Sequence, residues 1–216
     1  MRLVLFDVDG TLVDSQAHIV ASMEAAFATL GKAAPSRAET LSIVGLSLPR
    51  AMEVLAPDAP NAALVTAYKQ AYMDLRASHG EVSASPLYAG VRELLDALHA
   101  EPETLLGVAT GKSRRGLDHV IETHGLESYF VTRQDADGHP SKPHPSMGFA
   151  ALKEAGLEHG VMIGDTTFDM EMGRAAGMRT IGVTWGYHTA EALSPLSDAI
   201  VDDVAALHAT IDEVLS

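Results

Sequence analysis

The chain has 216 residues, a formal net charge of −14, 47% hydrophobic residues and no cysteine. Its length and composition indicate one globular core domain with a modest insert. The acidic balance excludes nonspecific binding to nucleic acid or to an anionic membrane face, and the lack of cysteine excludes disulfides, thiolate metal sites and a cysteine nucleophile.

The first apolar run covers residues 3–6 and is broken by Asp7, too early for a signal peptide or a membrane span. We therefore expect a soluble cytoplasmic protein. Short unbroken apolar runs of this kind are typical of strands buried on both faces of a parallel sheet. Such runs recur at residues 3–6, 105–109, 129–131, 161–163, 181–183 and 199–201.

Helical patterns lie between the later runs, with apolar residues three or four apart on one face. They cover residues 91–98, 117–121, 149–152 and 204–215. This alternation predicts an α/β fold, a doubly wound parallel sheet with helices on both faces, because crossovers between parallel strands are right-handed. Ligands of such folds bind at the carboxyl edge of the strands.

Residues 15–85 interrupt the alternation, because they hold several helical signals and no strand candidate. Ser15 is expected to cap a first helix that Gly31 ends, and Ser36 with Glu39 forms a capping box. Further helices are expected after Ser47 and before Gly80. We predict a small all-helical cap at residues 15–85, inserted after the first strand of a core formed by residues 1–14 and 86–216. Both connections would lie at the ligand edge, where a lid hinges.

Two carboxylates, Asp7 and Asp9, follow the first predicted strand. In extended geometry residues two apart project to the same side. The alternative interpretation is an Asp-Gly turn without a functional role. A calcium-binding loop is not an alternative, because Leu12 and His18 stand where that loop needs its glycine and its glutamate.

Polar residues also follow two other predicted strands, Thr110 after one and Asp165 after the other, with Asp169 one helical turn further on. Since parallel strand ends share an edge, these side chains are expected to converge with Asp7 and Asp9. Crowded carboxylates stay ionised together only beside a cation. Lys142 supplies one positive charge, and the remaining imbalance predicts a hard dication that prefers oxygen ligands, magnesium.

These residues resemble the four motifs of the haloacid dehalogenase-like phosphatase superfamily, in the same order and at the same strand ends. The helical insert after the first motif resembles the cap of the phosphoglycolate phosphatase-like branch. The resemblance covers the whole core, and its motifs are DVDGTLVDS at residues 7–15, Thr110, Lys142, and Gly164-Asp165 with Asp169.

The resemblance implies a magnesium-dependent phosphatase that hydrolyses small phosphate monoesters, phosphoglycolate-like ones first, through an aspartyl-phosphate. Asp7 would be the nucleophile and Asp9 the general acid/base. Thr110 would donate its hydroxyl to a phosphoryl oxygen, and Lys142 would bridge Asp7 and the transferring group.

The resemblance also implies the magnesium ligands. They would be the carboxylates of Asp7 and Asp165 and the main-chain carbonyl of Asp9. Asp169 would act through water or by fixing its neighbours. The partner of the protein would be a small phosphorylated metabolite, with no nucleic acid and no membrane.

Gly111 departs from the family pattern, because relatives often carry an Asn there; its N–H remains as a substrate contact but the side-chain amide is lost. Ser141, before Lys142, is a change without obvious chemical consequence. Two insert residues are candidate substrate contacts, His18 near the hinge and Arg50. For each, the alternative is a solvated side chain that contacts no substrate.

Two other functions stay open at this point. A sugar-phosphate mutase of the same superfamily would use the same acid/base aspartate and differ in how well its closed cap excludes water. A non-enzymatic phosphoacceptor like a receiver domain also joins acidic residues, a Thr and a Lys on a parallel sheet, but it needs neither a long insert nor Asp9. A carbon–halogen hydrolase is disfavoured, because such enzymes lack an equivalent of Asp9.

Overall fold

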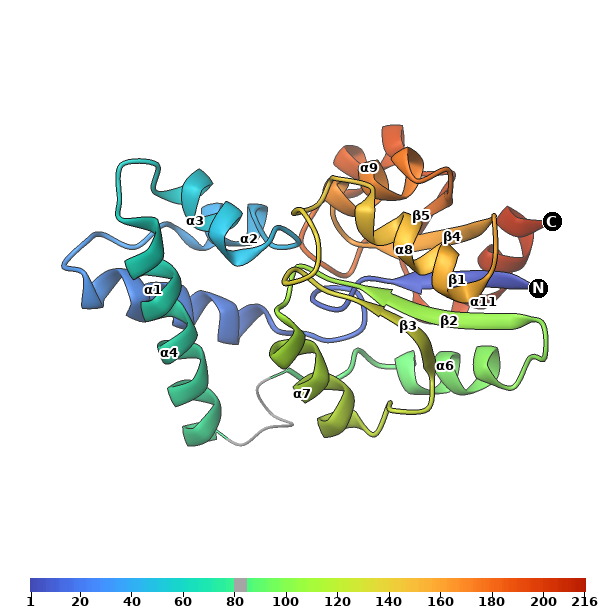
Figure 1. The fold of residues 1–216 in the computed structure, drawn as a ribbon, viewed down its shortest axis with the longest axis horizontal. Coiled ribbons are helices and arrows are strands. Elements are labelled where there is room, and N and C mark those ends of the chain that lie inside the picture. Colours follow the sequence, from blue (N-terminus) through green and yellow to red (C-terminus); the bar gives the residue numbers. More distant parts are fainter. Residues whose placement is uncertain (80–84) are drawn as a thin grey trace.

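A computed structural model describes residues 1–79 and 85–216 and shows a six-stranded parallel sheet with the strand order β3-β2-β1-β4-β5-β6 (Figure 1). This confirms the predicted doubly wound α/β fold. The strands are β1 (Arg2–Phe6), β2 (Thr104–Ala109), β3 (Phe130–Gln134), β4 (Gly160–Gly164), β5 (Arg179–Val183) and β6 (Ala199–Val201).

Helices cover both faces of this sheet (Figure 1). Because successive side chains of a strand point to opposite faces, Val4 and Phe6 pack with α6 (Val91–His99), α7 (Arg114–His124) and α11 (Val204–Leu215). Leu3 and Leu5 pack with α8 (Ser146–Ala155) and α9 (Thr167–Ala175) on the other face. A short helix α10 (Ala190–Leu193) and a 3₁₀ turn (Ser194–Leu196) precede β6.

The register of the central strand β1 aligns the ends of three strands. Phe6, its last residue, pairs with Val108 in β2 and with Ile163 in β4. The residues that follow these strands, Asp7, Thr110 and Asp165, therefore emerge at one edge of the sheet, as the sequence predicts.

In its described residues the insert forms four helices, α1 (Gln16–Thr29), α2 (Arg37–Ser42), α3 (Leu48–Leu55) and α4 (Asn61–His79), which lie beyond the carboxyl edge of the sheet (Figure 1). They enclose an apolar cluster of their own, with Met23, Met52 and Leu64 fully buried in it. We propose that they form a cap with the bounds 15–85 expected from the sequence; Gly80, the expected end of its last helix, lies outside the described residues. Among the helices in the described part of the chain, none is long and apolar enough to cross a membrane.

The caps of the insert helices follow the prediction in one case and depart from it in another. Ser36 and Glu39 form the expected capping box. Ser15 precedes α1, but its side chain makes no capping hydrogen bond. Its hydroxyl donates instead to the carboxylate of Asp9, so the prediction of a side-chain cap is wrong. The backbone of Ser15, with φ −102° and ψ 6°, lies outside the extended region that an N-cap residue usually adopts, which explains the missing cap.

The two chain connections of the insert are tied together. The Asp14 N–H donates to the Pro86 carbonyl at 2.8 Å, and Val13 and Leu87 form an isolated antiparallel bridge. The chain thus leaves the α/β core and returns to it at one point, close to the candidate site.

Candidate active site

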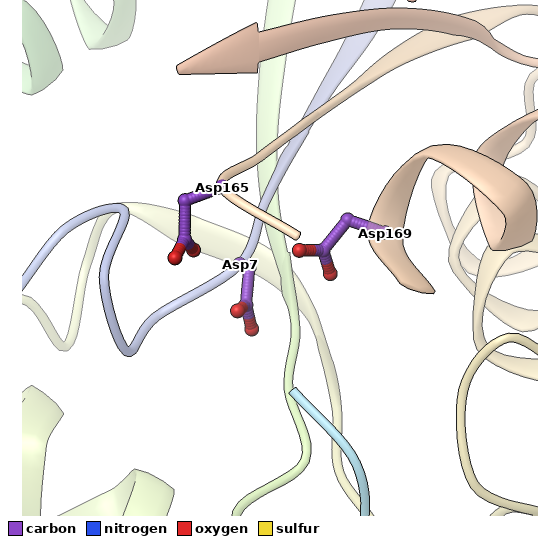
Figure 2. A group of neighbouring side chains, drawn as sticks. All are labelled: Asp7, Asp165 and Asp169. Atoms are coloured by element: carbon purple, nitrogen blue, oxygen red, sulfur yellow. The ribbon is translucent and has the colours of Figure 1, made fainter. Parts of the chain in front are cut away.

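Three buried carboxylates meet at the carboxyl edge of the sheet (Figure 2). Asp7 follows β1, Asp165 follows β4, and Asp169 lies in the first turn of α9. Each offers an oxygen within 4.8 Å of the others, and all three side chains are at most 1% exposed. Residues spread over most of the chain therefore converge as the sequence predicts.

Hydrogen bonds hold the carboxylate of Asp165 in place. Its oxygens accept hydrogen bonds from the Thr11 hydroxyl and from the Tyr187 N–H, both at 2.9 Å. Gly10 lets the loop pass beside it, because its φ is +82° and a Cβ there would lie 2.2 Å from the Asp165 carboxylate.

Hydrogen bonds also hold Asp169, which is the third helical residue of a capping box. It accepts hydrogen bonds from the N–H of Thr166 at 3.0 Å and from its hydroxyl at 2.6 Å. Its other oxygen faces the ammonium of Lys142 at 2.6 Å. All this leaves Asp169 little freedom to rotate.

Asp7 differs from these two, because within the described residues its oxygens accept no hydrogen bond from a backbone N–H or a hydroxyl. The Nζ of Lys142 lies 2.9 Å from its Oδ1, as an ion pair. Burial raises the pKa of Asp7 to about 7, although the charge of Lys142 opposes this. The Asp7 carboxylate is thus held in place but keeps its lone pairs available.

The charge balance of the cluster calls for a further cation. Burial, reinforced by the charges of Asp169 and Asp7, raises the pKa of Asp165 well above its usual range. Burial lowers the pKa of Lys142, but its two carboxylate partners outweigh that and raise it. Among the described residues, Lys142 pairs with two of the three carboxylates, Asp7 and Asp169, and the all-oxygen donor set of the cluster fits magnesium.

Asp9 lies beside this cluster and is held by a lysine that the sequence pattern does not single out. Its Oδ1 accepts the Ser15 hydrogen bond and lies 2.9 Å from the Nζ of Lys112. Burial lowers the pKa of Lys112, but Asp9 and then Tyr72 outweigh it and raise that pKa. Lys112 comes two residues after Thr110, at the end of a predicted strand, and that position was the only signal for it.

Thr110 is buried, and its hydroxyl accepts a hydrogen bond from the Lys112 N–H at 3.3 Å. The next residue, Gly111, is packed against the cap. A Cβ at this position would lie 2.5 Å from the carbonyl oxygen of Leu46 and 2.7 Å from that of Gly45. The backbone between α2 and α3 thus fills the space in which an asparagine side chain would stand.

Ser141 makes a second contact of this kind, and its consequence could not be read from the sequence. Its hydroxyl accepts a hydrogen bond from the Ser47 N–H at the start of α3, at 2.9 Å. The loop that carries Lys142 is thereby joined to the insert.

A cavity of about 380 Å³ opens between the carboxylates and the insert helices, and Asp7, Asp9, Thr110 and Gly111 all line it. Three cations that also line it form no ion pair with any described residue: Lys69, Arg76 and Arg115. In a chain of net charge −14, free cations at one cavity favour the entry of an anionic ligand.

Two predicted substrate contacts lie elsewhere. His18 is buried between α1 and α4, where its Nε2 lies 2.9 Å from the Tyr72 carbonyl and its ring meets the Tyr72 ring edge-on. Arg50 is exposed on α3 and pairs with Glu53 at 3.0 Å. Neither is among the described residues that line the cavity, so these positions do not support the expected contacts. Packing on α4 holds His18 away, and Arg50 sits on the outer side of α3.

Comparison with known proteins agrees with this geometry. The family model described as haloacid dehalogenase-like hydrolase matches residues 4–183. A probable phosphatase, IndB, of Dickeya dadantii (strain 3937) is 35% identical, with 97% of this chain and 94% of the relative covered. A phosphoglycolate phosphatase of Agrobacterium fabrum is 31% identical, with 99% and 93% covered.

Among solved structures, a predicted phosphatase from Clostridium acetobutylicum superposes with a TM-score of 0.84 at 26% identity, covering 98% of each chain. Membership of a hydrolase family from residue 4 to residue 183 does not fit a receiver-like phosphoacceptor. The chain therefore belongs to the haloacid dehalogenase-like hydrolases, among the phosphatases that resemble phosphoglycolate phosphatase.

Proposed function

We propose that the protein is a magnesium-dependent phosphatase that hydrolyses small phosphate monoesters through an aspartyl-phosphate. The observation that carries this proposal is the carboxylate of Asp7, which lines the cavity and has Lys142, at 2.9 Å from its Oδ1, as its one polar partner among the described residues. A buried carboxylate with free lone pairs is suited to nucleophilic attack.

In the first step an oxygen of Asp7 forms a bond to phosphorus while the bond to the alcohol oxygen breaks. Asp9 gives its proton to the departing alcohol. In the second step Asp9 takes a proton from water, the water oxygen attacks phosphorus, and phosphate leaves as Asp7 is freed. Lys112 and Ser15 orient Asp9 for both transfers, since both contact its Oδ1.

The phosphoryl group would be held by the hydroxyl of Thr110, the N–H of Gly111 and the ammonium of Lys142. The carboxylates of Asp7 and Asp165 and the main-chain carbonyl of Asp9 would hold magnesium. When bound, magnesium neutralises charge on the phosphoryl oxygens. Asp169, whose oxygens are engaged by Lys142 and Thr166, would fix these ligands in place.

The test is phosphate release from a panel of monoesters, including phosphoglycolate and hexose phosphates, with magnesium or with EDTA. We expect release only with magnesium, and none from Asp7→Asn. Asp9→Asn should lower the chemical step by several orders of magnitude while magnesium still binds. Asp58→Asn, an exposed exchange between α3 and α4, is the matched control and should not differ from the parent protein.

Three outcomes would contradict the proposal. Activity retained by Asp7→Asn would remove the nucleophile, and loss of magnesium binding in Asp9→Asn would make that side chain a ligand instead of an acid/base. Transfer of phosphate to another carbon of a hexose phosphate, with none released to water, would favour the mutase.

A further inference from the structure

The wall of the active-site cavity that faces the carboxylates is mainly apolar, although Lys69 and Arg76 on α4 also line it. Helix α1 contributes Ile19 and Met23, the connection after α2 contributes Ile43 and Val44, and α4 contributes Tyr68 and Met73. The polar lining is gathered at the sheet edge and in the cations described above. A bound monoester would thus have its phosphate at one end and its alcohol part against this apolar wall.

Tyr72 brings the apolar wall up to the reacting groups. Its ring lies 5.5 Å from the Nζ of Lys112, which itself pairs with Asp9 at 2.9 Å. The ring of Tyr68 follows at a centroid distance of 6.0 Å. Because Asp9 would protonate the leaving oxygen, the first carbons of the alcohol would lie beside Tyr72 and the rest of it beyond.

The size of the cavity matches this chemistry. Its volume of about 380 Å³ lies within the range of ~300–1,000 Å³ typical of cavities that enclose drug-sized ligands. A two-carbon glycolate group would leave most of the apolar wall in contact with water. A ring-sized apolar group would cover that wall, and removing apolar surface from water favours binding.

We propose that the preferred substrates are phosphate monoesters of alcohols that carry an apolar, ring-sized group, in preference to phosphoglycolate. This inference rests on the proposed phosphatase function and names the substrate class of the same site. It assigns the wall formed by Tyr68, Tyr72 and Met73 on α4, with its neighbours on α1, as the surface that selects the alcohol.

The test compares ethyl phosphate with 2-phenylethyl phosphate, because the two alcohols are nearly equal as leaving groups and differ by the ring alone. We expect kcat/KM to be at least about tenfold higher for the phenylethyl ester. Phosphoglycolate, assayed beside them, should be the poorer substrate. Equal values for the two esters, or the highest value for phosphoglycolate, would overturn the inference.

A binding measurement separates this inference from the proposed function. Calorimetry with propylphosphonate and 3-phenylpropylphosphonate, which cannot be hydrolysed, should give a Kd lower by at least about tenfold for the phenyl compound. If neither ester releases phosphate, the proposed function fails, while the two Kd values still decide the inference. Equal Kd values would overturn it even if both esters are hydrolysed.

A pair of variants on α4 locates the effect. Met73→Gln keeps the length and helix propensity of the side chain but puts an amide in the cavity wall, so the preference for the phenyl compounds should fall. Gln70→Met makes the reverse exchange at an exposed position on the same helix and should leave the preference unchanged. A preference unaltered by Met73→Gln would overturn the assignment of this wall.

Discussion

Asp7, the proposed nucleophile, should destabilise the metal-free protein. In Asp7→Asn the charge is lost while the shape of the side chain stays the same. Because burial raises the pKa of Asp7 from 3.8 to about 7 against the opposing charge of Lys142, ionisation of this carboxyl costs folding free energy. We therefore predict that Asp7→Asn is more stable than the parent protein in EDTA at pH 8, although it is inactive.

The size of the gain follows from linkage. A rise of about three pKa units at ~1.4 kcal/mol per unit gives at most about 4 kcal/mol. For an acid whose pKa is higher in the folded state, the penalty is absent below the unfolded pKa of 3.8. It grows as the pH rises and is complete above about pH 7. Magnesium should reverse the order, because it binds the folded parent protein.

The assay is denaturant unfolding of both proteins between pH 5 and pH 8, in EDTA and in magnesium, with Asp58→Asn as the control. We expect the advantage of Asp7→Asn in EDTA to widen with pH. A variant less stable than the parent protein at pH 8 in EDTA, or a difference that does not change with pH, would refute the reasoning.

Two further predictions concern backbone geometry and a surface network. Gly10→Ala puts a Cβ 2.2 Å from the carboxylate of Asp165, so we expect a loss of more than about 1 kcal/mol of stability and weaker magnesium binding. Glu101→Gln should cost about 1 kcal/mol at pH 7, because the Thr104 hydroxyl, followed by His208 and Arg2, lowers the pKa of Glu101 to about 2. Since the folded pKa is the lower one, this loss should shrink as the pH falls from 4.5 towards 2.

Each of these predictions has a matched control. Gly31 has a similar positive φ of +63°, but a Cβ added there would meet no atom within 4 Å. Gly31→Ala should therefore leave magnesium binding unchanged. Glu103→Gln alters a carboxylate that is 86% exposed and should barely affect unfolding. Equal magnesium affinities in the two glycine variants, or a Glu101→Gln effect that is constant from pH 7 to pH 3, would contradict the explanations given.

Much of the sheet could be predicted because burial on two faces leaves unbroken apolar runs. The first run, residues 3–6, differs from β1 by one residue. The third run, 129–131, falls short of β3, which continues to Gln134. The missing part is buried but polar: the Thr132 hydroxyl and the Gln134 amide both donate to the Glu154 carboxylate, at 2.6 and 2.8 Å. Hydrogen-bonded burial of this kind leaves no hydropathy signal.

The side chains of the site likewise fall into those whose positions could be predicted from the sequence and those whose positions could not. Asp7 and Asp165 could be placed together, because each follows a strand of one parallel sheet. The partners chosen across the cavity could not: Ser15 resembles a helix cap and bonds Asp9 instead, and Lys112 resembles a solvated charge and pairs with that same carboxylate. Arg50 on α3 is predicted as a substrate contact but is exposed and pairs with Glu53. Only the packing of the insert decides whether a cation on one of its helices faces the cavity or the solvent.

The hydrogen bond between Asp14 and Pro86 has a consequence for how such proteins diversify. A segment that departs and comes back at one backbone pair, 2.8 Å apart, can be lengthened, shortened or replaced beyond that pair without moving any strand. The proposed substrate-selecting helices of the insert can then change while the strands that carry Asp7 and Asp165 keep their places.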